Sequence, residues 1–177
     1  VDSDFYIKEV SRRDWKVWGN DAADKEYQQS HLPVRQMSDA VGHSVRAAYL
    51  YTAMADIAAV TKEPALTDAC LRLFDSISKR RMYITGGIGS SASNEGFTEP
   101  YDLPNESAYC ATCAPVGMVL WNQRMNMFKG ESRYADVVER SMYNGALAGM
   151  SISGDRFFYV NPLYSAGKHH RRAWYGT

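Results

Sequence analysis

The sequence lacks several features that would place it in a specialised class of protein. It has no apolar run near the roughly 20 residues that a bilayer-spanning helix needs, and its 20 basic and 20 acidic residues leave no net charge. A balanced charge favours neither nucleic acid nor an anionic membrane surface as a partner. No period of roughly 20 to 50 residues repeats, which argues against a solenoid. The 177 residues, 45% of them hydrophobic, suffice for one globular domain with its own core.

Cysteine is also scarce, and the odd number of three argues against a disulfide framework. Cys110 and Cys113 form a CxxC pair, but a structural zinc site would need a second pair. Redox pairs lie at a helix N-terminus after a strand, whereas we expect this pair about one turn inside a helix. Cys70 falls on an apolar helical stripe, so we expect it in the core.

The two ends of the chain suggest that it belongs to a longer protein. It begins at Val1 without a methionine or a secretory pattern, and residues 173–177 have the composition of structured sequence. We therefore interpret the chain as part of a larger protein. Its compartment stays open between the cytoplasm and the periplasm of a bacterium.

Helical periodicity appears after a polar, partly helical lead-in over residues 1–37. A first helix is predicted from a cap at Ser38 or Asp39, and Pro64 is suited to the first turn of a second helix that ends near Arg81. The apolar stripe of the first helix is Val41, Val45, Ala48, Tyr49, Thr52, Ala55 and Ala59. That of the second is Leu66, Ala69, Cys70, Leu73 and Ile77.

Two more helices are predicted in the second half of the chain. The third begins at a cap at Asn105 and the fourth covers residues 133–148, followed by a short β hairpin or strand at 154–159. The side chains of the third helix expected to face inward are Tyr109, Cys113, Val116, Leu120 and Trp121. Two helical hairpins joined by a long loop over residues 85–104 predict a mainly α fold, a segment of an α/α barrel or toroid. A loop of this length is usually either functional or disordered, and its place at one end of the hairpins fits a functional site.

Carboxylates gather in and just after this loop. Hydrolysis of a glycosidic bond uses a protonated carboxyl and a second group at the anomeric carbon, and the candidates are Glu95, Glu99, Asp102 and Glu106. Taken alone, such carboxylates are usually solvated surface residues. The glycine run at 86–89 lacks the Lys-Ser/Thr of a P-loop and a preceding strand, so we do not interpret it as a phosphate site.

Other polar residues have ordinary structural explanations. A single histidine at the start of a helix, as His43 is, more often caps the helix than binds a ligand. Tyr159 lies in an aromatic stretch that is typical of a core strand, and the basic run 168–172 is typical of a solvated loop.

Three segments in this order resemble glycoside hydrolase family 127, whose best-known members are β-L-arabinofuranosidases: GHSVRAAYLYTAMADIA, TGGIGS…NEGFTEPYDLPNESAYCATCA and FFYVNPL. The resemblance extends from about Pro33 to the C-terminus. It implies an (α/α)6 barrel catalytic domain followed by β-sandwich domains, with residues 1–177 forming part of the single barrel domain. It also implies an arabinofuranosyl oligosaccharide or glycoconjugate as substrate and leaves a homodimer open.

The resemblance assigns roles to individual residues. Glu95 matches the family's acid/base glutamate, and Cys113 matches a cysteine that binds zinc. His43 and Tyr159 match positions that contact the sugar, whereas Cys110 matches no ligand position. In the family, one glutamate and three cysteines bind zinc, and one of these cysteines is the nucleophile of a retaining reaction.

This sequence departs from the family pattern at two places. Ala111 stands where the family has its zinc-binding glutamate, and the cysteines that would include the nucleophile are expected beyond Thr177. We therefore expect the chain to be inactive by itself. The leading hypothesis is a retaining β-L-arabinofuranosidase, and the alternative is an inactive, carbohydrate-binding homologue. The third hypothesis is a helical scaffold with a redox-active CxxC.

Overall fold

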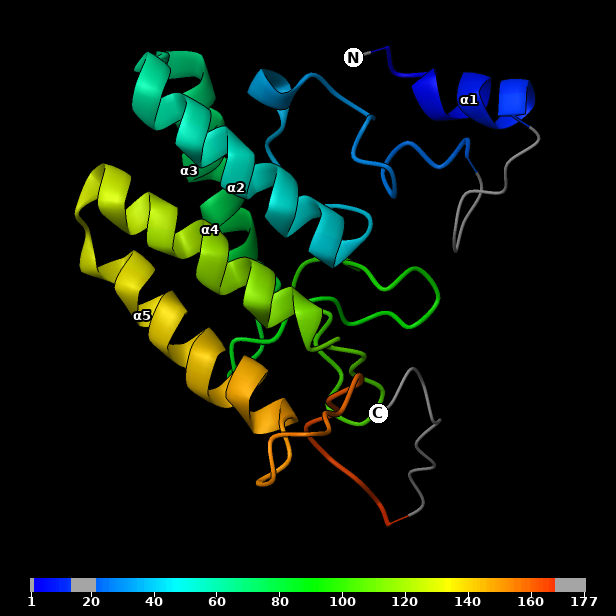
Figure 1. Ribbon diagram of the computed structural model, residues 1–177, viewed down its shortest axis with the longest axis vertical. Coiled ribbons are helices and arrows are strands. Elements are labelled where there is room, and N and C mark those ends of the chain that lie inside the picture. The colour runs from blue at the N-terminus through cyan, green and yellow to red at the C-terminus, as the bar shows by residue number, and fades with distance from the viewer. Residues whose placement is uncertain (1, 14–21, 168–177) are drawn as a thin grey trace.

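Helices dominate the computed structural model, which describes residues 2–13 and 22–167 (Figure 1). Four long helices form two antiparallel hairpins: α2 (Ser44–Thr61) with α3 (Pro64–Arg80), and α4 (Cys113–Lys129) with α5 (Ser132–Arg140). Within the described ranges, β structure is limited to isolated bridges. The predicted mainly α fold is confirmed. None of the described helices combines the length and apolarity that crossing a bilayer requires.

The lead-in is partly helical, as predicted. It contains α1 (Phe5–Arg13), which buries none of its residues, and a single 3-10 turn, η1 (Val34–Gln36), that contacts α3. In Figure 1, α1 lies at the edge of the structure, away from the two hairpins. The basic run 168–172 of the sequence analysis lies outside the described residues.

The first hairpin matches its prediction except at its start. Pro64 begins α3, and the predicted α3 stripe is buried. However, α2 begins at Ser44 with His43 as its N-cap, not at a cap at Ser38 or Asp39. The cause is local: the Asp39 carboxylate binds Arg81, and Gly42 adopts a positive φ of 68° that interrupts a helix.

The second hairpin begins later than predicted. The cap is Thr112 and not Asn105, because residues 105–112 bond to another part of the loop. Tyr109 N donates to Ser90 O at 3.1 Å, and Cys110 N donates to Gly89 O at 2.9 Å. These bonds keep the chain out of a helical conformation until α4 starts at Cys113. The CxxC pair therefore lies at the helix start and not one turn inside.

The fourth helix does not end as a regular α-helix. After Arg140, α5 continues as a π-helical turn, η2 (Ser141–Ala146), and a 3-10 turn, η3 (Leu147–Gly149). The β hairpin or strand predicted at 154–159 is reduced to an antiparallel bridge between Met150 and Phe157, flanked by hydrogen bonds from Ser151 N to Arg156 O and from Phe158 N to Gly149 O, without a continuous strand in the described backbone.

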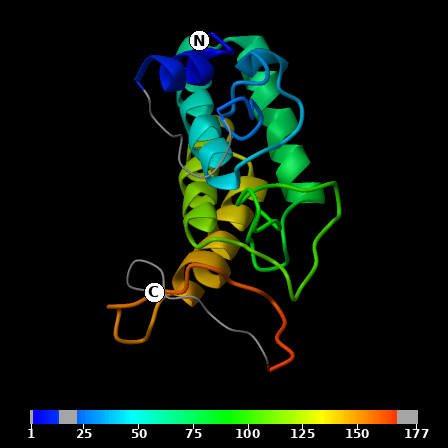
Figure 2. The same ribbon diagram turned by 90° about the vertical axis from the view of Figure 1, so that its right-hand side faces the viewer.

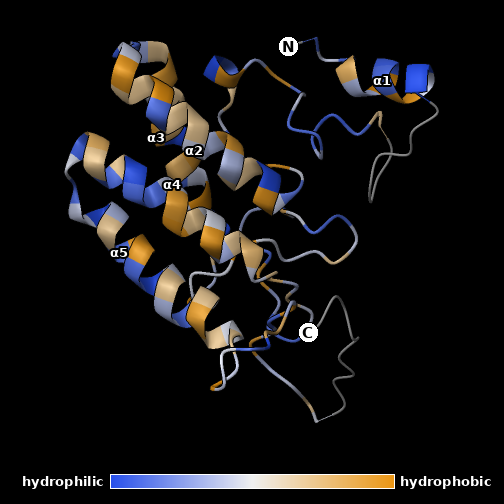
Figure 3. Ribbon diagram, viewed as in Figure 1, coloured by the Kyte–Doolittle hydropathy of each residue, from blue (hydrophilic) through white to orange (hydrophobic). Residues whose placement is uncertain are grey.

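The core lies between the hairpins. Each long helix contributes one aromatic ring: Tyr51 and Trp121 have centroids 5.2 Å apart, Phe74 and Trp121 6.3 Å, and Phe74 and Tyr134 4.6 Å. Figure 3 shows apolar residues recurring along α2 and α4. Figure 2 places α2 and α4 in one layer, with α3 and α5 beside them.

The α2–α4 contact depends on small residues, which explains three wrong core predictions. A Cβ on Gly117 would lie 2.8 Å from the Ala48 Cβ, so the helices approach closely where both side chains are small. Tyr49, Val116 and Leu120 were predicted to face inward but are exposed. The larger side chains thus point away from this close contact.

The hairpins place the long loop at one end of the bundle. Both α2 and α4 begin at that end, and α3 and the α5–η2 segment finish there (Figures 1 and 2). The loop therefore meets two helix N-termini, which position the candidate site.

Candidate active site

The backbone of Glu95 is bound to the first turn of α2. Ser44 donates two hydrogen bonds to the Glu95 carbonyl, from its N–H at 3.1 Å and from its Oγ at 2.9 Å. Phe97 N donates to Gly42 O at 2.9 Å. A Cβ on Gly96 would lie 2.2 Å from Gly42 O, so only glycine allows this approach. Residues 42–44 and 95–97 therefore lie side by side.

This pairing brings His43 next to the Glu95 carboxylate. The His43 Nδ1 accepts a hydrogen bond from Arg46 N at 3.3 Å as the helix cap, so the proton of the neutral ring is on Nε2. That Nε2 lies 3.6 Å from Glu95 Oε2. The edge of the His43 ring packs on Tyr27, with centroids 5.1 Å apart. The cap therefore determines both the tautomer and the direction of the imidazole.

Tyr159 reaches the same carboxylate from the C-terminal part of the described chain. Its phenol donates to Glu95 Oε2 at 3.0 Å, and the Cys113 thiol donates to the phenol oxygen at 3.8 Å. The structure thus brings together all four predicted site residues: Glu95, His43, Tyr159 and Cys113. They come from the loop, the cap of α2, the segment after η3 and the start of α4.

Asn161 holds this C-terminal segment in place, a role that the sequence analysis missed. Its side chain donates to Cys110 O and to Thr112 Oγ1, both at 2.9 Å. Thr112 N in turn donates to Tyr159 O at 2.9 Å. The signal in the sequence was the FFYVNPL motif, in which Asn161 follows Tyr159 by two residues.

Tyr109 also lies at the candidate site, in a position that differs from its prediction. Predicted on the inward face of a helix, it lies in the loop with its ring packed edge-on against Tyr159, at 6.1 Å between centroids. Its phenol also interacts with the Glu95 carboxylate. Two phenols and one imidazole therefore surround Glu95.

These neighbours favour the ionised form of Glu95. The facing His43 lowers the pKa of Glu95 most, and Tyr159 and Tyr109 add to the effect, although partial burial opposes it. Burial raises the pKa of the Cys113 thiol, in spite of its contact with Tyr159. At rest the site therefore holds a carboxylate among hydrogen-bond donors, beside a neutral thiol.

The remaining predicted carboxylates stay apart from Glu95. The structure shows that Glu99, Asp102 and Glu106 are exposed to solvent. Carboxylates in loops are usually solvated in this way.

The other two cysteines are buried. Cys70 lies in the core, as predicted, and burial raises its pKa to about 11. Burial likewise raises the pKa of Cys110 to about 12, which makes this thiol a poor redox nucleophile. The burial and raised pKa of Cys110 weigh against a redox-active CxxC.

The residues present do not make a metal site by themselves. In the part of the chain that the structure describes, no three His, Cys, Asp or Glu side chains lie together in a group that could hold a metal ion. Ala111 is buried, and its methyl group offers no donor. Cys113 is thus a single candidate ligand.

Comparison with known proteins identifies one family. Residues 6–177 match the catalytic domain of the GH127 β-L-arabinofuranosidases. The non-reducing end β-L-arabinofuranosidase of Bifidobacterium longum subsp. longum is 39% identical over 161 residues, which are 85% of this chain and 24% of that protein.

Solved structures agree in sequence and in fold. A GH127 β-L-arabinofuranosidase from Geobacillus stearothermophilus T6 is 46% identical with a TM-score of 0.85, over 93% of this chain and 26% of that one. A GH127 β-arabinofuranosidase is 47% identical with a TM-score of 0.80, over 85% and 24%. The chain thus spans about a quarter of the length of these relatives. The predicted resemblance and the segment of an α/α barrel are confirmed.

Proposed function

The chain belongs to the GH127 β-L-arabinofuranosidase family, and from this we propose that the protein is a retaining glycoside hydrolase that releases β-linked L-arabinofuranose. The relatives named above are arabinofuranosidases, which supports this substrate class. The observation that carries the proposal is the cluster around Glu95, in which polar atoms of the predicted catalytic and sugar-contacting side chains lie 3.0 to 3.8 Å apart.

Glu95 serves as the general acid/base in this proposal. In a retaining reaction the same carboxyl protonates the leaving oxygen and then takes a proton from water. The lowered pKa of Glu95 suits the second step. For the first step, a bound sugar that takes over hydrogen bonds from Tyr159 or His43 and excludes water would raise this pKa.

His43 and Tyr159 orient the sugar in this proposal. Both present a hydrogen-bond donor at Glu95 Oε2, so a sugar hydroxyl that enters beside the carboxylate meets the same two groups. Tyr109 adds an aromatic ring next to Tyr159. Aromatic faces suit the apolar side of a sugar ring.

Zinc is part of the proposal for the whole protein only. Cys113 would be its one ligand from this chain, and the remaining donors would come from outside the described residues. Bound zinc would keep a cysteine nucleophile deprotonated.

The second candidate function is sugar binding without turnover. The observation that favours it is Ala111, which puts a buried methyl group where the resemblance expects a carboxylate ligand. Such a protein would keep the Glu95 pocket and lack part of the metal site.

One set of assays on the full-length protein separates the two candidates. We expect release of L-arabinose from β-L-arabinofuranosides, loss of about 100-fold or more in kcat on Glu95→Gln, and bound zinc in elemental analysis. The control is Glu99→Gln, an exposed loop carboxylate, which should retain the parent activity. If the parent protein binds the sugar but turns over only after Ala111→Glu, the binding function holds instead. If the Ala111→Glu protein neither binds zinc nor releases arabinose, the catalytic assignment is refuted.

A further inference from the structure

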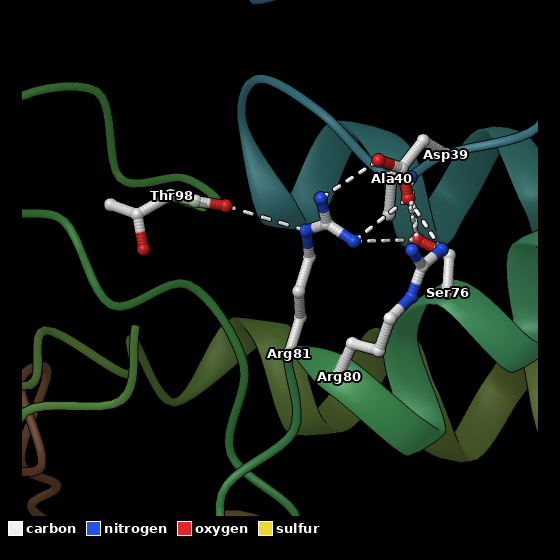
Figure 4. A network of polar contacts seen from close by, with 6 residues as sticks. All are labelled: Asp39, Ala40, Ser76, Arg80, Arg81 and Thr98. Carbon is white, nitrogen blue, oxygen red and sulfur yellow. Dashed lines mark hydrogen bonds and ion pairs between the residues drawn. The ribbon is translucent and has the colours of Figure 1, made fainter. Parts of the chain in front are cut away.

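Arg81, just after the end of α3, is a buried charged residue with every guanidinium nitrogen engaged (Figure 4). Its side chain is only 6% exposed. Nη1 and Nη2 each donate to one oxygen of Asp39 at 2.8 Å, and Nη1 also donates to Ser76 Oγ at 2.9 Å. Nε donates to Thr98 O at 3.3 Å. A buried guanidinium needs such complete pairing, because an unpaired charge would be very costly.

The partners of Arg81 lie on the two segments that form the candidate site. Asp39 lies four residues before His43, and Thr98 lies three residues after Glu95. Ala40 N donates to Ser76 Oγ at 2.9 Å, which fixes the first segment to α3 a second time. Arg81 thus joins the two segments just outside the place where residues 42–44 and 95–97 pair.

The flat fork of the guanidinium is what makes this link. The two terminal nitrogens of Arg81 bind one carboxylate, and Nε remains free to donate to Thr98 O in the other segment. An ammonium group does not provide this geometry. Arg80 offers a built-in comparison. It also donates to Asp39 Oδ1, at 3.0 Å, but from a more exposed position and without a bond to Thr98.

We propose that Arg81 is a positioning residue that sets the distance between His43 and Glu95 by joining Asp39 to Thr98. The consequence for catalysis rests on the proposed function of Glu95 as acid/base. The hydrogen bonds of Arg81 go to Asp39, Ser76 and Thr98, so its effect on His43 and Glu95 passes through the backbone of both segments.

The test compares Arg81→Lys with Arg80→Lys in the full-length protein. Arg81→Lys keeps a positive charge near Asp39 but loses the link to Thr98. We expect faster amide hydrogen exchange at Ser44 and Phe97, whose N–H groups bond across the two segments, and a fall in kcat of about 10- to 100-fold, the scale of a misplacement near 1 Å. KM should change little. Arg80→Lys should leave both measurements at parent values.

The two readouts separate failure of this proposal from failure of the proposed function. Parent-like exchange at Ser44 and Phe97 in Arg81→Lys would overturn the positioning role. Exchange that rises equally throughout α2, α3 and α4 would also overturn it, because Arg81 would then only stabilise the fold. Suppose that exchange in Arg81→Lys rises only at these two amides, and that the parent protein itself releases no arabinose. The positioning role then holds, and the catalytic role of Glu95 fails.

Discussion

His43 uses its two ring nitrogens for two separate tasks. Nδ1 satisfies an N–H at the start of α2, and Nε2 faces the Glu95 carboxylate. The capping bond therefore determines which ring nitrogen carries the proton that faces Glu95. The same side chain contributes to helix stability and to the candidate site.

The two tasks can be separated by mutation. Asn caps helices well but is too short to reach Glu95, so His43→Asn should retain the thermal midpoint and raise the pKa of Glu95 toward its ordinary value. Because the first step needs Glu95 protonated, the basic limb of kcat/KM against pH should then move to higher pH. His43→Ala loses the cap as well and should cost about 1 kcal/mol of unfolding free energy more than His43→Asn. A basic limb that stays in place in His43→Asn would contradict the assigned contact.

Asp39 makes the stability of the protein depend on acid pH. Burial alone would raise the pKa of Asp39, but bonds from Ser76 and Arg81 lower it below the ordinary value of 3.8. A lowered folded-state pKa stabilises the protein above the ordinary value, and this stabilisation is lost as pH falls through the folded-state pKa. Asp39→Asn should therefore flatten the decline of urea-unfolding stability below about pH 4. Asp68→Asn, which changes an aspartate on α3, is the control and should leave the decline unchanged.

Among the described elements, α2 and α4 make the most extensive contact. Gly117→Val should destabilise the protein by about 1 to 3 kcal/mol, because its side chain would be forced against Ala48. The measurement is urea unfolding, with Val116→Ala on the exposed side of the same helix as the control. The control should change stability by less than about 0.5 kcal/mol. Equal effects of both changes would show that close packing at Gly117 is unimportant.

The helices differ in how far the sequence predicts them. The start and the stripe of α3 follow from Pro64 and a local apolar period, so both were predicted correctly. The start of α4 depends on bonds from Tyr109 and Cys110 to residues about 20 positions earlier, at Ser90 and Gly89. No local pattern contains such pairing. The same limit explains why Val116 and Leu120 were predicted inside, since the contact of α4 with α2 selects its small residues.

The candidate site shows a similar division. The resemblance named four candidate residues from motifs in order along the sequence, and the structure brings these four side chains together. The roles of Asn161 and Arg81 could not, since each acts by joining segments that are distant in the chain. Their side-chain types are common on protein surfaces, and only the fold shows that they are bound on several sides.

For the whole molecule, the aromatic rings of the core couple the two hairpins. Trp121→Ala should cost about 3 to 5 kcal/mol, because the ring touches Tyr51 in α2 and Phe74 in α3. The expected result is a single, earlier unfolding transition that far-UV circular dichroism and tyrosine fluorescence report together. Trp121→Phe should recover much of the loss. Two separate transitions would mean that the hairpins unfold independently.

The π-helical turn η2 carries one more consequence, for insertions and deletions. Its wider winding holds one residue more than an α-helical turn would, and it is packed in place, since a Cβ on Gly145 would lie 2.6 Å from the Pro115 Cβ. Removing one residue between Ser141 and Ala146 would therefore leave a regular α-helical turn of about the same rotation, so the segment that carries Tyr159 would keep its direction toward Glu95. The same deletion within α5 would instead rotate all that follows by about 100°. A one-residue change in length is therefore tolerated at η2 and disruptive within α5.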